Sequence, residues 1–310
     1  MAFSDSHDNS YVAELIQIGQ ERTPFLTIMG DISGGGQSTD SFQFPMTSPW
    51  ELGSGVQPSI TETESVAGQT ATRFDRTQNY NTCEIHQFAV QTSYKRKSTM
   101  GQLTGINLAN RRANVQDETA FQIMAHLKQM SKNVEYSMLN GTRVYATDNT
   151  TAATMGGITS FVPAANTVDA STADISKALV DQLVRQMADE GSAFNTPILF
   201  CSMLQKQRIS EIYGYVPEHR NVGGLNIQYL ETDAVSFGIV WCPQLVASTI
   251  LLADMAQCSP VFCPVPGKGH LFYEEKTQAG ASEGGMLYGQ IGLSVGDVTD
   301  HGKIINVSTS

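Results

Sequence analysis

The chain has 310 residues, of which 41% are hydrophobic and 16% are charged, and its formal net charge is −11. This composition can fill a hydrophobic core and excludes wholesale disorder, which needs high charge and few apolar residues. The acidic balance argues against a general nucleic-acid binder, because such a protein carries a basic surface. The low charge content indicates that much of the surface faces other protein, since interface cores are depleted in charge.

The chain has no sign of a membrane segment or of a disulfide framework. Its apolar runs are shorter than the roughly 18 residues that span a membrane, so no membrane partner is expected. The opening residues, MAFSDSHDNS, have neither the basic nor the apolar part of a signal peptide. An odd number of cysteines predicts buried free thiols in a reducing compartment. The cysteines are Cys83, Cys201, Cys242, Cys258 and Cys263.

The N-terminal segment predicts a short helix and a linker. Residues 10–22 follow a helical pattern, and Thr23-Pro24-Phe25 should break it, because proline disfavours helical geometry in the residue before it. The Gly/Ser stretch at 31–40 predicts a flexible linker. Its glycines, Gly34 to Gly36, are not followed by the Lys-Ser/Thr pair and helix of a phosphate cradle, so the linker interpretation is favoured.

A long two-stranded excursion is predicted next. Residues 41–46, SFQFPM, alternate with period two and contain a proline, which is typical of an edge strand. Residues 47–81 are polar with few large apolar groups, and 82–94 predict a returning strand. The whole of 39–100 therefore looks like a ribbon with little core of its own. Because an isolated ribbon is marginal in water, it should need a partner surface.

The strongest helical pattern covers about 117–140 and predicts a spine-like helix. Apolar residues three or four apart line one face, and Gly141 should end the helix in a left-handed conformation. That face consists of Met124, Leu127, Met130, Val134 and Met138.

Two shorter helices are predicted at 174–190, before Gly191, and at 204–214. The buried face of the first should consist of Ile175, Leu179, Leu183 and Met187. The strands predicted in this part of the chain are 197–203, 225–232, 238–244, 248–255, 270–278 and 286–295. This order of elements predicts an α+β fold with an exposed extension.

Charges are separated along the chain, with an acidic block before residue 92 and a basic block from 93 to 143. Separated blocks can pair between copies of a chain, which makes these residues candidate inter-subunit contacts. A solvated face is the plainer alternative, and a nucleic-acid contact is disfavoured by the acidic remainder of the chain. The candidates are Glu51, Glu62 and Glu64 in the acidic block and Lys95, Arg96, Lys97, Arg111 and Arg112 in the basic block.

Catalytic and metal-binding patterns are weak. Residues 280–284, GASEG, match the G-x-S-x-G pattern of a serine hydrolase, with His301 and Asp297 or Asp300 as partners. That motif needs a helix after the serine, whereas the residues after Ser282 predict a strand. The spacings of Cys242, Cys258 and Cys263 do not fit structural zinc, and the histidines form no metal motif. We therefore expect no enzyme, no cofactor and no metal.

The order and spacing of several segments resemble tailed-bacteriophage major capsid proteins of the HK97 fold, in a branch once described only as a domain of unknown function. The resemblance covers roughly residues 10–306. It rests on Thr-Pro-Phe at 23–25 and an extended ribbon, then RTQNYNTCEIHQFAVQTS (76–93), QDETAFQIMAHLKQMSKNVEYSMLNG (116–141), MGGI (155–158), LQKQRISEIYG (204–214) and HLFYEEKTQAGASEGGMLYGQIGLSVGDVTDHGKI (270–304).

This resemblance implies a domain organisation. It predicts an N-terminal arm (1–38), an extended E-loop (39–100) and a peripheral domain (101–170) that contains the spine helix. It also predicts an axial domain (171–262) and a return of 263–310 to the peripheral domain.

The function that the resemblance implies is self-assembly into an icosahedral head around a double-stranded DNA genome. The expected partners are copies of the chain in hexamers and pentamers, possible scaffold, portal and cement proteins, and DNA through weak non-specific contacts. The expected location is the virion, assembled in the bacterial host cytoplasm. The alternatives are an encapsulin-like nanocompartment shell, a serine hydrolase that uses Ser282, and a tail or fibre protein, which the mixed α/β pattern disfavours.

Overall fold

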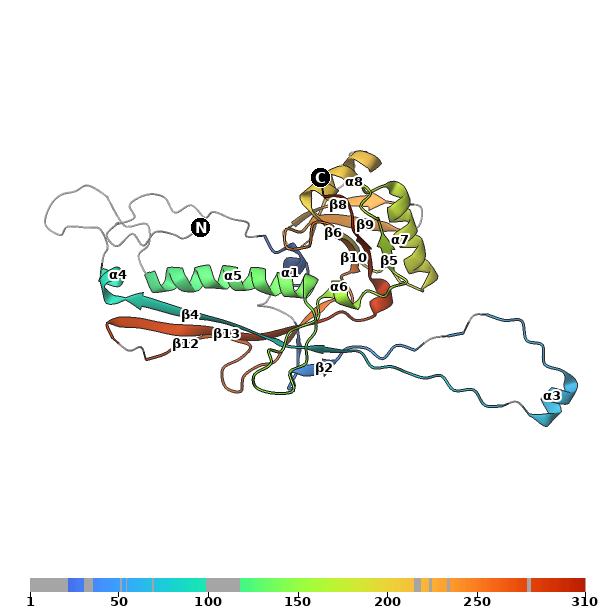
Figure 1. Cartoon of the computed structure of the whole chain (residues 1–310), viewed down its shortest axis with the longest axis horizontal. Coiled ribbons are helices and arrows are strands. Elements are labelled where there is room, and N and C mark those ends of the chain that lie inside the picture. Colours follow the sequence, from blue (N-terminus) through green and yellow to red (C-terminus); the bar gives the residue numbers. More distant parts are fainter. Residues whose placement is uncertain are drawn as a thin grey trace.

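The computed structural model describes residues 22–30, 36–50, 52–53, 55–68, 70–98, 118–214, 219–222, 225–232, 235–277 and 280–309. The molecule is elongated: a long helix and long strands run side by side toward one end, and a loop reaches out at the other (Figure 1). A second sheet with its own helices lies between them. Apart from Arg22, the helix predicted at 10–22 lies outside the described residues.

The long strands form one sheet, called here the long sheet. Its order is β1 (Gln37–Ser38), β11 (Ser259–Phe262), β13 (Ser282–Ser294) and β12 (Leu271–Glu275), and β4 (Glu84–Ser93) pairs with the other edge of β13. The pairing of β4 with β13 is antiparallel and runs from Glu84↔Ile291 to Ser93↔Ser282. The flexible linker predicted at 31–40 is therefore wrong at Gln37–Ser38, which pair with β11.

The predicted strand at 82–94 is confirmed, but its predicted role as one limb of a long ribbon is wrong. Among the described residues, the strands that pair across the excursion are β2 (Gln43–Pro45) and β3 (Tyr80–Thr82), over three residues each. On one face of β4 the side chains of His86, Val90 and Thr92 are buried, so this strand belongs to the body of the molecule. A strand that buries one of its faces pairs in the sheet where the rest of the molecule covers that face.

The spine helix α5 (Glu118–Asn140) lies along β4 and β13, which confirms the prediction for 117–140 (Figure 1). Met130, Val134 and Met138 are buried as expected, whereas Met124 is exposed. Gly141 follows the helix without adopting a left-handed conformation. A Cβ on it would lie 2.4 Å from the Ser137 carbonyl oxygen, so glycine is required here by close backbone approach.

The second sheet has seven strands within the described residues. Its order is β5 (Thr167–Asp169), β14 (Gly302–Ile305), β10 (Ile250–Asp254), β6 (Pro197–Cys201), β9 (Ser236–Trp241), β8 (Leu225–Glu231) and β7 (His219–Val222). The helices α7 (Lys177–Asp189) and α8 (Met203–Tyr213) pack against it and confirm two predicted helices. The strands β5, β7, β11 and β14 are too short to show a clear hydrophobic repeat, so the sequence does not predict them.

Helix α7 begins later than predicted. Ser176 caps it by accepting a hydrogen bond from the Leu179 amide, so Ile175 precedes the helix although its side chain is buried. Within the helix, Leu183 and Met187 are fully buried and Leu179 is partly buried, largely as expected.

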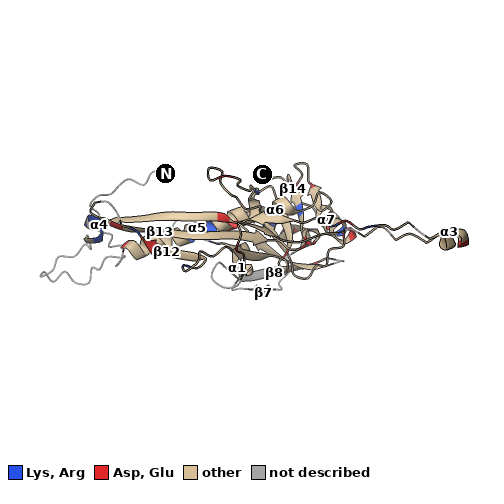
Figure 2. Cartoon of the chain, turned by 90° about the horizontal axis from the view of Figure 1, so that it is seen from below, with Lys and Arg blue, Asp and Glu red and all other residues tan. Residues whose placement is uncertain are grey.

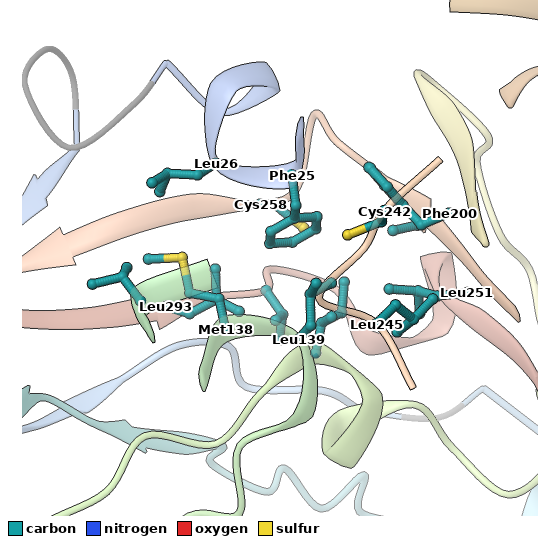
Figure 3. Close-up of a cluster of buried hydrophobic side chains, with 14 of the residues drawn as sticks. Phe25, Leu26, Met138, Leu139, Phe200, Cys242, Leu245, Leu251, Cys258 and Leu293 are labelled. Carbon is teal, nitrogen blue, oxygen red and sulfur yellow. The ribbon is translucent and has the colours of Figure 1, made fainter. Parts of the chain in front are cut away.

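The largest hydrophobic cluster joins the two sheets through α5 and α1 (Pro24–Ile28) (Figure 3). Arg22 and Thr23 are not helical, and Pro24 begins a new helix that the sequence pattern did not predict. Proline fits this position, since the first amides of a helix have no intrahelical partner. Phe25 packs edge-on against Phe200 of β6, with ring centroids 5.3 Å apart.

The remaining helices are short: α3 (Glu62–Ala67), α4 (Tyr94–Ser98), α6 (Ile158–Phe161) and the 3-10 turn η1 (Val298–Asp300). All five cysteines are buried and free, which confirms their predicted state. None of the helices in the described part of the chain has the length and apolar character of a membrane span.

Replacing Leu183 with alanine should lower the free energy of unfolding by about 2–5 kcal/mol, because the side chain is fully buried between α7 and β14. Denaturant unfolding of the unassembled chain measures this change. Ile212→Ala on α8 is the control, since Ile212 is partly exposed and should cost much less. A Leu183→Ala variant as stable as the parent would show that this face of α7 is not core.

Candidate functional site

The most distinctive surface is a loop that leaves the body between β2 and β3, called here the projecting loop (residues 47–79). Its two limbs are joined near the base, where the Met46 amide donates to Asn79 O at 2.8 Å and the Asn79 amide donates to Thr47 O at 2.8 Å. The Thr77 amide donates to Pro49 O at 3.2 Å. Further out the limbs separate and reach far from the body (Figure 1).

The projecting loop exposes large apolar side chains, contrary to the expectation that it would have few. The exposed fraction reaches 74% for Leu52 and 85% for Val66. Trp50 and Phe74 meet across the limbs with ring centroids 5.7 Å apart, yet both remain more than half exposed. A row of exposed apolar groups on one element marks a contact surface. The row consists of Trp50, Leu52, Val56, Ile60, Val66 and Phe74.

The tip of the projecting loop is the acidic helix α3. Thr61 caps it: its hydroxyl accepts from the Glu64 amide, and the Glu64 carboxylate accepts from the Thr61 amide at 2.9 Å. These hydrogen bonds hold the pKa of Glu64 below its usual value. Glu64 is therefore a structural cap as well as a charge, whereas Glu62 lies exposed in the first turn.

The basic residues of α4 lie at the opposite end of the molecule from α3 (Figures 1 and 2). Lys97 pairs with Glu283 of β13, and Arg96 Nε lies 3.4 Å from Glu118 Oε1 at the start of α5. Lys95 is exposed on the same turn. The acidic and basic candidates that the structure describes are thus not brought together within one chain.

Three of the candidate contact residues cannot be placed. Glu51, Arg111 and Arg112 lie outside the described residues.

The buried side chain of Asn81 anchors the base of the projecting loop. Its Nδ2 donates to the carbonyl oxygens of Gly156 at 3.0 Å and Leu293 at 2.7 Å. Its Oδ1 accepts from the amides of Gly156 and Thr82, both at 2.8 Å. One amide group therefore joins β3, the segment before α6 and β13. Sequence reasoning missed this residue, since a single asparagine near a strand carries no signal of its partners.

A groove between β4 and α5 contains titratable groups that serve the fold. The Glu84 carboxylate accepts from the Met155 amide at 3.2 Å and from the Ser137 hydroxyl at 3.3 Å. His86 is buried with Nε2 4.0 Å from Glu84 Oε1, and burial lowers its pKa. These contacts hold the segment after α5 against β4.

The G-x-S-x-G segment has no catalytic geometry. Ser282 begins β13, a strand, and its hydroxyl accepts from Gln91 Nε2 at 2.9 Å. His301 is fully buried, with Nδ1 accepting from the Asp254 amide and Nε2 2.7 Å from Val295 O. Since Val295 follows Ser282 by thirteen residues along an extended strand, at about 3.3 Å per residue the two lie on the order of 40 Å apart. The proposed triad is therefore excluded.

A family model described as SU10 major capsid protein matches residues 2–308 of this chain. Two phage-type capsids are similar in structure. A chain of the native GTA particle capsid gives a TM-score of 0.63 at 10% identity, covering 99% of this chain and 98% of that chain. A chain of the cyanophage A-1(L) capsid gives 0.62 at 12% identity, covering 100% of this chain and 99% of that chain.

An encapsulin is also similar, though less so. The SrpI encapsulin of Synechococcus elongatus PCC 7942 gives a TM-score of 0.57 at 11% identity, covering 89% of this chain and 86% of that chain. A search of curated protein sequences finds no match. At these identities the structural likeness shows the fold, which is the HK97-type capsid fold expected from the sequence.

Replacing Asn81 with alanine should destabilise the chain by several kcal/mol, because each buried group that loses its partner costs about 1–3 kcal/mol. The Gly156 amide and the Leu293 carbonyl would both lose their partner. Denaturant unfolding measures the loss. Gln78→Ala, which removes an exposed side chain at the same base, is the control and should change little. Equal stability of the two variants would contradict the anchoring role.

Proposed function

Because the chain belongs to the SU10 major capsid protein family, we propose that its copies close into an icosahedral head around a phage double-stranded DNA genome. The family makes it a capsid-forming structural protein of a phage virion and not an enzyme. A closed shell repeats one set of self-complementary interfaces over all its copies. The chain therefore needs surfaces that are completed only by another copy.

The finer organisation follows the family pattern. We propose hexamers and pentamers as the capsomers, with the axial region (171–262) around their axes and, of the expected E-loop (39–100), the projecting loop reaching a neighbour. The arm (1–38) and the peripheral parts (101–170 and 263–310) complete the subunit. Assembly takes place in the host cytoplasm, with scaffold, portal and cement proteins as candidate partners and only weak, non-specific contacts to DNA.

The exposed apolar row on the projecting loop is the observation that carries this proposal. Fixing an ordered backbone costs about 1–2 kcal/mol per residue, and this loop buries little within its own chain to offset that cost. A second copy that covers Trp50, Leu52 and Val66 would supply the missing burial. In a protein that does not assemble, the same exposed apolar surface would promote aggregation.

A nanocompartment shell is the second candidate, because an encapsulin shares the fold. The two differ in what the shell encloses. Electron microscopy of particles purified from the native source, with nuclease treatment and analysis of the contents, separates them. Protected DNA supports the head, an enclosed enzyme supports the nanocompartment, and no particle under any condition contradicts both.

The projecting loop should exchange its amide hydrogens fast in the free subunit and slowly in the shell. The described residues 52–53 and 55–60 have no backbone partner in the opposite limb, and the amides of α3 bond only within one short helix and its cap, so lasting protection has to come from a neighbour. Hydrogen exchange on both states measures this difference. Peptides from α5 are the internal control, because they should be protected in both. Strong protection of the loop in the free subunit would contradict the coupling.

We further propose that the acidic tip of one copy docks on the basic end of another. Glu62→Lys should impair assembly while leaving the unassembled fold intact, and raising the salt concentration should weaken assembly of the parent, because exposed ion pairs are screened. Light scattering measures particle formation. Glu62→Gln, which removes the charge without reversing it, should have the smaller effect.

Two further variants separate charge from structure. Glu64→Gln keeps a side chain that can complete the cap of α3, so any loss of assembly in it reports charge. Lys95→Glu should partly rescue Glu62→Lys. Normal assembly of Glu62→Lys at low salt would mean that α3 is only a solvated face.

A further inference from the structure

Glu135 is a buried carboxyl group that is not part of the proposed assembly surface. It lies on α5, its side chain is fully buried, and its hydrogen-bond partners Leu26 and Cys242 belong to the largest hydrophobic cluster. Its Oε2 accepts a hydrogen bond from the Leu26 amide at 3.1 Å. Its Oε1 accepts from Cys242 Sγ at 3.4 Å. The carboxyl group thus connects α5 with α1 and with the turn after β9.

The contact with α1 replaces a missing helix cap. The first amides of a helix have no intrahelical partner and are usually satisfied by the side chain of the preceding residue. Here that residue is Thr23, whose side chain makes no capping hydrogen bond. The amides of Phe25 and Leu26 turn instead to Glu135, which lies more than a hundred residues later in the chain.

We propose that Glu135 is a pH-sensitive latch that holds α1 on the spine helix when its carboxyl is protonated and loosens it when the carboxyl ionises. A buried carboxylate without a cationic partner is costly, whereas the neutral acid is not. Lifting α1 away would return the charge to water.

The groups around Glu135 leave its charge uncompensated. From α1 it meets Phe25 and Leu26, and from the turn after β9 it meets the thiol of Cys242, whose pKa is itself raised by burial. Arg22, just before α1, lies instead over the Trp241 ring, with Cζ 5.7 Å from its centroid.

Leu26 and Cys242, the hydrogen-bond partners of Glu135, belong to a cluster whose further members include Phe200 of β6, Leu251 of β10 and Leu293 of β13 (Figure 3). On its own helix the charged residues one and two turns earlier are Lys132 and Lys128, neither of which is buried. No cation from these elements is therefore positioned to neutralise the carboxylate among the described residues.

Burial raises the pKa of Glu135 to about 7, against the opposing effect of its hydrogen bonds. When α1 is lifted and the group is solvated, its pKa returns to its usual value of 4.5. A group whose pKa is higher in the docked state stabilises that state at low pH. This stabilisation is complete below pH 4.5 and is lost as the pH rises through about 7. The docking equilibrium should fall on the order of a hundredfold between pH 5 and pH 8.

Trp241 is a natural reporter of α1, because Arg22 contacts its ring. In a Trp50→Phe background, which leaves Trp241 as the one tryptophan, the fluorescence of the full, unassembled chain should change as the pH rises from 5 to 9, the range over which docking weakens. Glu135→Gln should remove this transition. Glu84→Gln removes the charge of another carboxyl group, away from α1, and should retain the transition. A transition that persists unchanged in Glu135→Gln would overturn the latch.

Hydrogen exchange on the unsubstituted chain provides a test that does not depend on a variant folding. The peptide that covers residues 24–28, corrected for the intrinsic effect of pH on exchange, should lose protection about tenfold between pH 6 and pH 8. A peptide from β10 should keep its protection. Equal protection of 24–28 at both values would overturn the proposal. Because both tests use single chains, their outcome is independent of whether the protein assembles into a head.

Discussion

Four hydrogen bonds to the buried side chain of Asn81 hold the base of the projecting loop against the body, and the geometry of the outer surface depends on them. A loop that buries little of its own surface has too few internal contacts to fix its direction. Its direction comes from the point where it is anchored, between β3, the segment before α6 and β13. The buried amide satisfies two donors and two acceptors at that point, which makes the anchor directional as well as strong.

The body behind this anchor is built to be long and stiff. The spine helix α5 lies over β4 and β13, and the two strands pair along the whole length of β4. As a consequence, the acidic tip α3 and the basic turn α4 lie at opposite ends of the molecule (Figure 2). Opposite charges at the two ends of a rigid subunit favour head-to-tail contacts between copies, which is the kind of contact that a closed ring repeats.

Local pattern was a good guide to some elements and a poor guide to others. Helices α5, α7 and α8 were predicted because each has an apolar face and a clear end. Helix α1 was not predicted, because proline is found both where helices end and where they begin. The strand at 82–94 was predicted, but its partner, β13, lies about 200 residues further along the chain. The apolar residues of the projecting loop's exposed row are widely spaced in the sequence, so they form no repeat that would predict a contact surface.

The sequence by itself determined the α+β class, the spine helix, the absence of a plausible catalytic motif around Ser282 and, through the order of its segments, the capsid family. Only the tertiary structure decided which strand pairs with β4, that α3 and α4 lie at opposite ends, and that Asn81 and Glu135 each join distant parts of the chain. The reason is physical. Periodicity along a chain reports which face of an element is buried, because burial follows the 3.6- or two-residue repeat. It does not report which distant segment covers that face or satisfies a buried polar group.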